Sequence, residues 1–315
     1  MFFIFKKDGR DEKEVEKLTM YMVVGVVVGA RLGHCLFYDP LTYLSNPLEI
    51  FKIWEGGLAS HGGAIGIMVV LWLFARKMKG MTYFWILDRI AIVVCLVGAC
   101  IRTGNFMNSE ILGTETDAFT GVVFAQPVKQ LLYNYSQIED IDFINSENYP
   151  DAGDGLEPIT AVIEFKPDTG NGSLDVNNIK RAVESYSHYS NHVALIDGKL
   201  PYRTYTSGVT AYGELDFYGI ARHPAQMYEA IYCVFIFLLL FHIWYWHRAK
   251  LPEGYLFGLL LIILWSLRFV DEFFKMNQEP WEEGLALNMG QLLSIPMVIA
   301  GIVILIKVSM KKKAQ

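Results

Sequence analysis

The chain has 315 residues, of which 53% are hydrophobic, 14% aromatic and only 19% charged. Soluble domains carry about 25% charged residues, so this composition leans toward the lipid bilayer and argues against an ordinary soluble domain. The formal net charge is −6, and we expect no nucleic-acid partner.

The charge is unevenly distributed along the chain. Residues 114–221 hold 16 acidic and 6 basic side chains, whereas the remainder holds 17 acidic and 21 basic side chains. We therefore expect an acidic soluble insertion at 114–221 within a mildly basic membrane body, whose two halves are residues 1–113 and 222–315.

The first five residues, Met1–Phe5, are apolar but too short to cross a membrane. They read like the last turn of an apolar helix that runs into Lys6, which suggests that a leading helix is lost. The alternative is a short hydrophobic start without meaning.

Apolar runs of roughly 17–25 residues are typical of membrane-spanning helices. The chain contains six of them, at 18–37, 57–75, 84–101, 223–246, 254–272 and 289–307. Inside the insertion, Ile159–Phe165 favours a strand and Asp175–Val183 a capped helix. The predicted fold is an all-α polytopic membrane protein of about six transmembrane helices with an inserted small α/β extracytoplasmic domain.

Basic residues set the expected orientation. The four short polar segments 1–17, 76–82, 247–253 and 307–315 carry five, three, two and four Lys or Arg, whereas 39–56 and 273–288 carry one each. Short cytoplasmic loops are enriched in Lys and Arg. We therefore expect the first set, with the C-terminus, in the cytoplasm and residues 114–221 outside.

Polar side chains gather at the outer ends of four predicted spans. Because ionisable groups at membrane depth are costly, they usually mark function or a paired structural site. At 1.5 Å of rise per residue, each lies within about two helical turns of the interface. They are His61, Arg102, Asn105, Asn108, Glu110, His223, Gln226, Tyr228, Glu229, Arg268, Asp271 and Glu272.

Their chemistry suits a lipid phosphate. Arg102 and Arg268, on separate helices, offer planar forks of donors that match a phosphate diester. Glu272 lies one helical turn from Arg268 and is expected to orient it. The amides of Asn105, Asn108 and Gln226 suit a polyol head group.

Each residue also has a structural interpretation. His61 is a helix-start residue of the kind that often caps or lines an interface, and Arg102 and Arg268 resemble arginines that extend toward head groups. Arg222 and His223 stand where the soluble insertion ends. Arg31 fits a structural ion pair, and Asp88–Arg89 a structural role.

The four cysteines lie in apolar runs without metal-ligand spacing, so we expect reduced packing residues. Val97–Cys100 looks like a lipidation box but lies mid-chain inside a predicted helix. No metal or nucleotide motif appears, and we expect no cofactor.

Several segments, in the correct order, resemble the prolipoprotein diacylglyceryl transferase family. The resemblance extends over about 200 of the 315 residues, and the segments that carry it are Gly29–Gly33, Trp54–Gly63, Gly98–Gly113 (typically GRxGNFxNxE in the family), Arg222–Glu229 (RHPSQLYE), Arg268 with Glu272–Phe274, and Met289–Met297. The family usually has seven spans, with a functional tyrosine in the first, and a shorter segment in place of 128–216.

The resemblance implies phosphatidylglycerol as donor and the lipobox cysteine of prolipoprotein signal peptides as acceptor, at the bacterial cytoplasmic (inner) membrane. It implies catalytic roles for His61, Arg102 and Arg268. The implied substrate-binding residues are Arg102, Asn105, Asn108, Glu110, Gly113, His223, Gln226, Tyr228, Glu229 and Glu272.

Two other functional classes stay open on the sequence alone. A lipid-binding or solute transporter would place its charges near the midplane, with repeat symmetry, whereas here they lie at one face. A non-catalytic scaffold or inactive truncated paralogue would keep the helices without the transfer.

Overall fold

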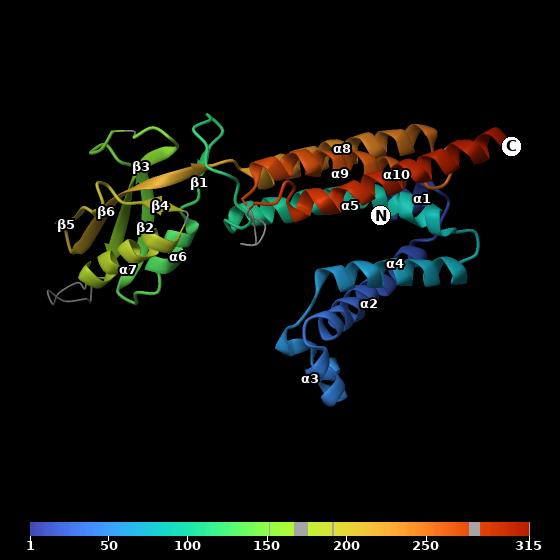
Figure 1. The fold of residues 1–315 in the computed structure, drawn as a ribbon, viewed down its shortest axis with the longest axis horizontal. Coiled ribbons are helices and arrows are strands. Elements are labelled where there is room, and N and C mark those ends of the chain that lie inside the picture. The colour runs from blue at the N-terminus through green and yellow to red at the C-terminus, as the bar shows by residue number, and fades with distance from the viewer. Residues whose placement is uncertain (151, 167–175, 191, 277–283, 315) are drawn as a thin grey trace. The chain divides into compact units, whose positions relative to one another are not determined.

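The computed structural model describes residues 1–150, 152–166, 176–190, 192–276 and 284–314 (Figure 1). The chain divides into two compact units. Unit 1 comprises Met1–Val97, Cys233–Ser266 and Ile295–Gln315, and unit 2 comprises Gly98–Tyr232 and Leu267–Ser294. Each unit is a separate body with its own interior. The three-part division at residues 113 and 221 stays a prediction.

Each apolar run of the sequence contains a helix. The six helices are α2 (Glu12–Phe37), α4 (Ser60–Lys77), α5 (Tyr83–Met107), α8 (Ala225–His247), α9 (Tyr255–Asp271) and α10 (Met289–Ala314). Among the described residues, α2, α5, α8 and α10 are long and apolar enough to cross a membrane. The predicted polytopic membrane protein is therefore confirmed, and the number of six spans stays a prediction.

Short helices make up the rest of the helical part. They are α1 (Phe2–Lys7), α3 (Pro40–Ser45) and the 3-10 turns η1 (Pro47–Phe51), η2 (Ile53–Glu55) and η3 (Glu272–Phe274). α1 and the start of α2 share a hydrophobic core with α4 and α5, built around Phe5, Leu18, Leu71, Phe74 and Ile86. The apolar first residues are thus packed within unit 1.

In unit 1, α2 and α4 approach closely through glycines (Figure 1). A Cβ atom built on Gly33 would lie 2.7 Å from the Cα atom of Gly62, and one built on Gly29 would overlap the carbonyl oxygen of Gly62. Small residues let helix backbones touch, which replaces the hydrophobic effect as the source of helix association in a bilayer. This glycine contact holds the pair together.

Two buried charges of unit 1, Arg31 and Asp88, are satisfied by backbone groups. Arg31 donates to the carbonyl oxygens of Glu49 (2.5 Å), Ile50 (2.9 Å) and Gly56 (2.7 Å). The Asp88 carboxylate accepts from the backbone N–H groups of Gly254 and Phe257, both at 2.8 Å. These contacts agree with a structural role for Arg31 and Asp88, but among the described residues the ion pair expected for Arg31 is replaced by hydrogen bonds to backbone carbonyls.

The insertion in unit 2 is an antiparallel sheet with two helices. The strand order is β1 (Val122–Val123), β6 (Thr210–Arg222), β3 (Leu156–Phe165) and β2 (Ile138–Asn145). β4 (Val193–Ala194) and β5 (Tyr202–Ser207) also pair with β6, and the helices are α6 (Gln126–Leu132) and α7 (Val176–Tyr189). The predicted small α/β domain is therefore confirmed.

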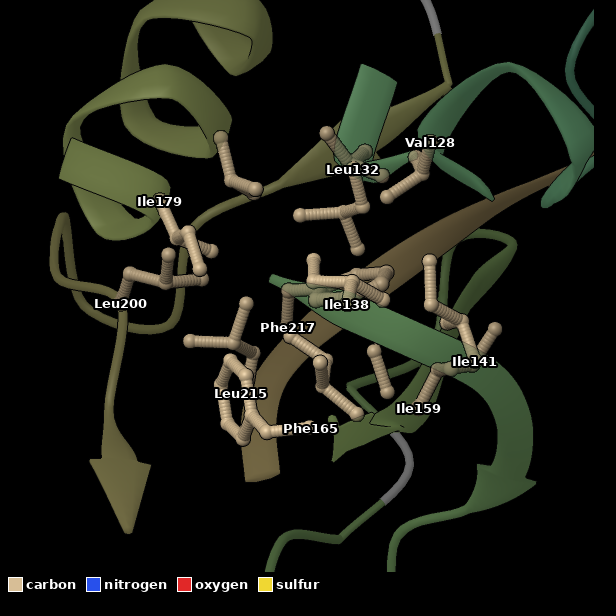
Figure 2. Packing of buried hydrophobic residues seen from close by; sticks show 14 residues of the cluster. Val128, Leu132, Ile138, Ile141, Ile159, Phe165, Ile179, Leu200, Leu215 and Phe217 are labelled. Carbon is tan, nitrogen blue, oxygen red and sulfur yellow. The ribbon is translucent and has the colours of Figure 1, made fainter. Parts of the chain in front are cut away.

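Side chains from the sheet and both helices meet in one core (Figure 2). Alternate residues of β3, namely Ile159, Ala161, Ile163 and Phe165, are buried in it, as period-2 patterning requires. The predicted strand 159–165 lies within β3 and the predicted helix within α7, whereas its expected cap, Asp175, lies outside the described residues.

The four cysteines are thiols that take part in no disulfide among the described residues. Cys35, Cys95 and Cys233 are buried, whereas Cys100 is exposed on α5. The packing role predicted from the apolar neighbours of Cys100 is therefore wrong, because its side chain lies on the outward side of its helix.

Candidate functional site: one carboxylate bound by three cations

Glu229, in the first turns of α8, is the centre of the charged part of unit 2. Its carboxylate contacts Arg102 of α5 (Nε to Oε2, 2.9 Å) and Arg268 of α9 (Nη1 to Oε1, 3.2 Å). Lys275, just after η3, donates to Oε2 at 2.9 Å. Three cations from separate segments therefore meet on one carboxylate.

Two further carboxylates complete the group. Glu272 lies 3.4 Å from Arg268 Nη2, and Lys275 Nζ lies 2.9 Å from Asp271 and 3.3 Å from Glu272. The expected pairing of Glu272 with Arg268 is thus present. We call this set the ionic cluster: Arg102, Glu229, Arg268, Asp271, Glu272 and Lys275. Its three positive and three negative charges balance, which buried charges require.

Exposure divides the ionic cluster into two kinds of residue. The Lys275 and Glu229 side chains are 2% and 7% exposed, whereas those of Arg102 and Arg268 are 16% and 26% exposed. A guanidinium group stays charged and has five N–H donors, so it can bind more than one anion at a time. The two arginines can therefore be reached by an anion while Glu229 holds them in place.

Lys275 was not predicted as a site residue, since the sequence marks it only as a basic residue of a short outer loop. Burial alone would lower its pKa, but Glu229, Asp271 and Glu272 together raise it above its ordinary value. The available signal was its spacing, four residues after Asp271 and three after Glu272, where helical side chains meet.

Amide groups gather around Glu110, which follows α5. Asn105 and Asn108 donate to its carboxylate at 2.7 Å and 3.4 Å, and Gln226 donates to its carbonyl oxygen at 2.5 Å. Asn105 also accepts from Arg102 Nη1 at 3.4 Å. The amide residues predicted from the sequence therefore lie together, and Asn105 joins them to the ionic cluster.

The backbone around Glu110 is strained. Ser109 and Ile111 both have positive φ, 56° and 57°, a region that β-branched residues such as isoleucine rarely adopt. Such strain persists only where the surrounding structure imposes it, and it concentrates at functional sites. The two residues fix the direction in which Glu110 meets the amides.

Gly113, His223 and Tyr228 form a neighbouring group. His223 Nδ1 lies 3.2 Å from the Tyr228 hydroxyl, which lies 3.1 Å from Thr120 Oγ1. A Cβ atom on Gly113 would lie 2.8 Å from the Cβ of His223 and from the carbonyl oxygen of Phe274, so only glycine fits. This close approach joins the segment after α5 to the start of α8.

Arg222 ends β6 and is buried. It donates to the Gly113 carbonyl at 3.1 Å and to Glu115 at 3.0 Å. Burial lowers its pKa below the ordinary value, although Glu115 opposes this. Its contacts match the alternative in which Arg222 bounds the insertion.

His61 belongs to unit 1, where it is the second residue of α4. Its ring packs against Phe37 (5.4 Å between centroids) and Tyr38 (5.9 Å). Its catalytic role stays a prediction. In the part of the chain that the structure describes, no group of three or more His, Cys, Asp or Glu side chains could hold a metal ion.

Comparisons with known proteins were made for the whole chain. The family model described as "Prolipoprotein diacylglyceryl transferase" matches residues 1–307. A phosphatidylglycerol–prolipoprotein diacylglyceryl transferase of Tolumonas auensis is 35% identical over 312 residues, covering 99% of this chain and 85% of the relative. Proteins of the same name from Porphyromonas gingivalis (35% identical, 94% and 78% covered) and Chloroherpeton thalassium (30% identical, 96% and 79% covered) are also similar.

Proposed function

The chain belongs to the prolipoprotein diacylglyceryl transferase family, and on that premise we propose that it transfers the diacylglyceryl group of phosphatidylglycerol to the lipobox cysteine of bacterial prolipoproteins. The protein is then a membrane-bound transferase that acts in lipoprotein biosynthesis. Its partners are an anionic lipid and the signal peptide of a second protein.

The observation that carries this proposal is the meeting of Arg102 and Arg268 on Glu229. The two guanidinium groups come from different helices and are held by one buried carboxylate, and the side chains of both arginines are partly exposed. A phosphate diester accepts from such donors in two directions at once. The ionic cluster thus supplies a fixed place for the phosphate of the donor lipid.

The same arginines suit the chemical step. The cysteine sulfur attacks the carbon of the diacylglyceryl unit that is bonded to the phosphate oxygen. A C–S bond forms, the bond between that carbon and the phosphate oxygen breaks, and the head group leaves as glycerol 1-phosphate. Negative charge that grows on the departing phosphate is stabilised by donors that are already in place. Arg102 and Arg268 are therefore proposed as catalytic residues as well as binding residues.

The acceptor thiol has an ordinary pKa of about 8.5 and is mostly protonated near neutral pH. A base must therefore take its proton before or during attack. We assign this role to His61, an imidazole at the start of α4.

The remaining polar residues are proposed to bind substrate. Asn105, Asn108 and Gln226 offer amide groups to the hydroxyls of the glycerol head group, and the Gln226 Oε1 atom is buried without a hydrogen-bond partner among the described residues. Glu272 orients Arg268. The other proposed members are Glu110, Gly113, His223, Tyr228 and Glu229.

The distribution of Lys and Arg supports a placement in the bacterial cytoplasmic membrane with six spans and a cytoplasmic C-terminus. In this placement residues 114–221 form an extracytoplasmic domain, and 1–113 and 222–315 are the halves of the catalytic body. The acceptor cysteine, the ionic cluster and the insertion would then share the outer face.

The direct test incubates the purified protein with phosphatidylglycerol and a lipobox peptide, followed by mass measurement of the peptide. We expect a gain of one diacylglyceryl unit and release of glycerol 1-phosphate. A peptide with serine in place of the lipobox cysteine is the control and should gain nothing. An unchanged mass of the cysteine peptide would contradict the proposal.

A further inference from the structure

Lys275 is the most enclosed cation of the ionic cluster. Its side chain is only 2% exposed, and its ammonium group lies 2.9 Å from Glu229, 2.9 Å from Asp271 and 3.3 Å from Glu272. The ammonium group donates hydrogen bonds to Glu229 and Glu272, and Asp271 lies at ion-pair distance. Lys275 is therefore placed to act on the carboxylates and not on a substrate.

The backbone also fixes Lys275. Its neighbours pair with the segment that follows Glu110: Thr114 N–H donates to the Phe274 carbonyl (2.8 Å), and Met276 N–H donates to the Leu112 carbonyl (3.1 Å). Gly113 and Lys275 face each other in this two-stranded contact. Backbone pairing therefore fixes the position of Lys275, and the carboxylates fix its ammonium group.

The charge balance of the ionic cluster depends on Lys275. Without it, Glu229, Asp271 and Glu272 would carry three negative charges against the two positive charges of Arg102 and Arg268. The surplus negative charge would lie in a poorly solvated place, where electrostatic effects are strong. It would draw the guanidinium groups toward the carboxylates and repel an anionic diester.

Arg102 and Lys275 share one oxygen atom of Glu229. Its Oε2 atom contacts both Arg102 Nε and Lys275 Nζ, each at 2.9 Å. A carboxylate whose charge is partly neutralised by an ammonium group attracts the guanidinium group less strongly. The shared contact thus holds Arg102 while leaving its other donors to a ligand.

We propose that Lys275 is a positioning residue for the donor lipid: by neutralising Glu229, Asp271 and Glu272, it leaves the positive charge of Arg102 and Arg268 available to the lipid phosphate. This inference rests on the proposed function. In this inference Lys275 touches no substrate, yet its charge controls the affinity of the site for an anionic lipid.

The test compares Lys275→Met, which keeps the length and loses the charge, with Lys275→Arg, which keeps the charge. We expect Lys275→Met to raise the KM for phosphatidylglycerol about tenfold and to lower kcat/KM about a hundredfold, with the KM for the lipobox peptide unchanged. Lys275→Arg should retain kcat/KM within about threefold. Lys180→Met on α7, a lysine outside the ionic cluster, is the matched control.

A double variant separates charge balance from mere structure. Asp271→Asn combined with Lys275→Met removes one charge of each sign, so we expect it to recover most of the affinity for phosphatidylglycerol. If Lys275→Met does not fold, this neutral variant decides alone. An affinity within about threefold of the wild type supports the proposal, and an affinity as weak as that expected for Lys275→Met overturns it.

Equilibrium binding of phosphatidylglycerol to the detergent-solubilised protein gives a reading that needs no turnover. Weaker binding to Lys275→Met, with none of the change in the Lys180→Met control, supports the positioning role even if the wild type transfers nothing, a result that would reject only the proposed function. Wild-type affinity in a folded Lys275→Met variant would overturn the inference.

Discussion

Arg31 of unit 1 differs from Arg102 and Arg268 of unit 2 in the groups that satisfy its guanidinium. In unit 1, Arg31 is 4% exposed and donates to backbone carbonyl oxygens. In unit 2, Arg102 and Arg268 bind the Glu229 side chain, and their own side chains are 16% and 26% exposed. The first arrangement fixes the course of the chain, and the second is the one that we propose for binding an anionic ligand.

The difference shows how to read an ionisable residue of a membrane protein. Both kinds are costly to bury and look alike in a sequence. A residue whose donors end on the backbone stabilises a turn or a loop. A residue that shares a carboxylate with other cations belongs to a network in which one more anion can be accommodated. The groups that an ionisable side chain contacts therefore distinguish a structural residue from a candidate site residue.

The largest effect is expected from replacing one of the two arginines that bind Glu229 in unit 2. Arg102→Ala or Arg268→Ala removes a donor for the lipid phosphate and leaves Glu229 with one cation fewer. We expect transfer to the lipobox peptide to fall by at least about a hundredfold, as when an oxyanion donor is removed. Arg181→Ala, on the exposed side of α7, is the control and should transfer at the wild-type rate. Near-normal rates in both site variants would reject the roles given to the two arginines.

Replacing Arg31 in unit 1 should lower stability and leave the affinity for the lipid unchanged. Arg31→Met leaves the carbonyls of Glu49, Ile50 and Gly56 without their donor, so we expect a loss of about 3 kcal/mol in the free energy of unfolding. The KM for phosphatidylglycerol of the molecules that remain folded should stay close to that of the wild type. Thermal unfolding in detergent and the lipid dependence of the rate measure the two quantities. A raised KM without a lower melting temperature would contradict the comparison.

The glycine contact of unit 1 gives a smaller effect with a matched control. Gly62→Ala places a Cβ atom 2.7 Å from the Cα atom of Gly33, whereas Gly63→Ala on the same helix meets its nearest atom at 3.6 Å. We expect Gly62→Ala to cost about 2 kcal/mol of stability, as overpacking does. Gly63→Ala should be tolerated. Equal melting temperatures for the two variants would contradict the close approach of α2 and α4.

The smallest effect concerns the insertion, away from both sets of arginines. Burial, together with the charge of Arg222, lowers the pKa of His192, whose ring stacks on Tyr186. The folded state then keeps His192 neutral while the unfolded chain takes up a proton. Stability therefore falls as the pH drops through about 6.5.

Hydrogen exchange of the β6 amides in the full chain, followed between pH 7 and lower values, measures this slope. His192→Phe should remove the part of the slope that belongs to this residue. An unchanged slope would show that another group titrates.

Much of the helical part could be predicted from the sequence. The six apolar runs matched helices because continuous hydrophobicity over about 20 residues depends on local composition alone. The strand within β3 and the helix α7 followed from short-range patterning as well. The strands β1, β2, β4, β5 and β6 and the helix α6 were not predicted, since strand pairing depends on partners distant in the chain.

The site was predicted in its members but not in its centre. Arg102, Arg268 and the amides were found because polar residues stand out in apolar helices. The sequence did not reveal that Glu229 joins both arginines, or that Lys275 is buried among three carboxylates. Such contacts are set by how α5, α8 and α9 pack within unit 2, which no single segment encodes.

The most direct test of the account asks whether Arg102 and Arg268 serve one phosphate. It measures kcat/KM for diacylglyceryl transfer against the phosphatidylglycerol content of mixed micelles, for Arg102→Lys, Arg268→Lys and the double variant. Because the two groups act as a unit, the double variant should lose far less than the product of the two single losses. Losses that simply multiply would show that the two arginines act independently, and would contradict the shared site.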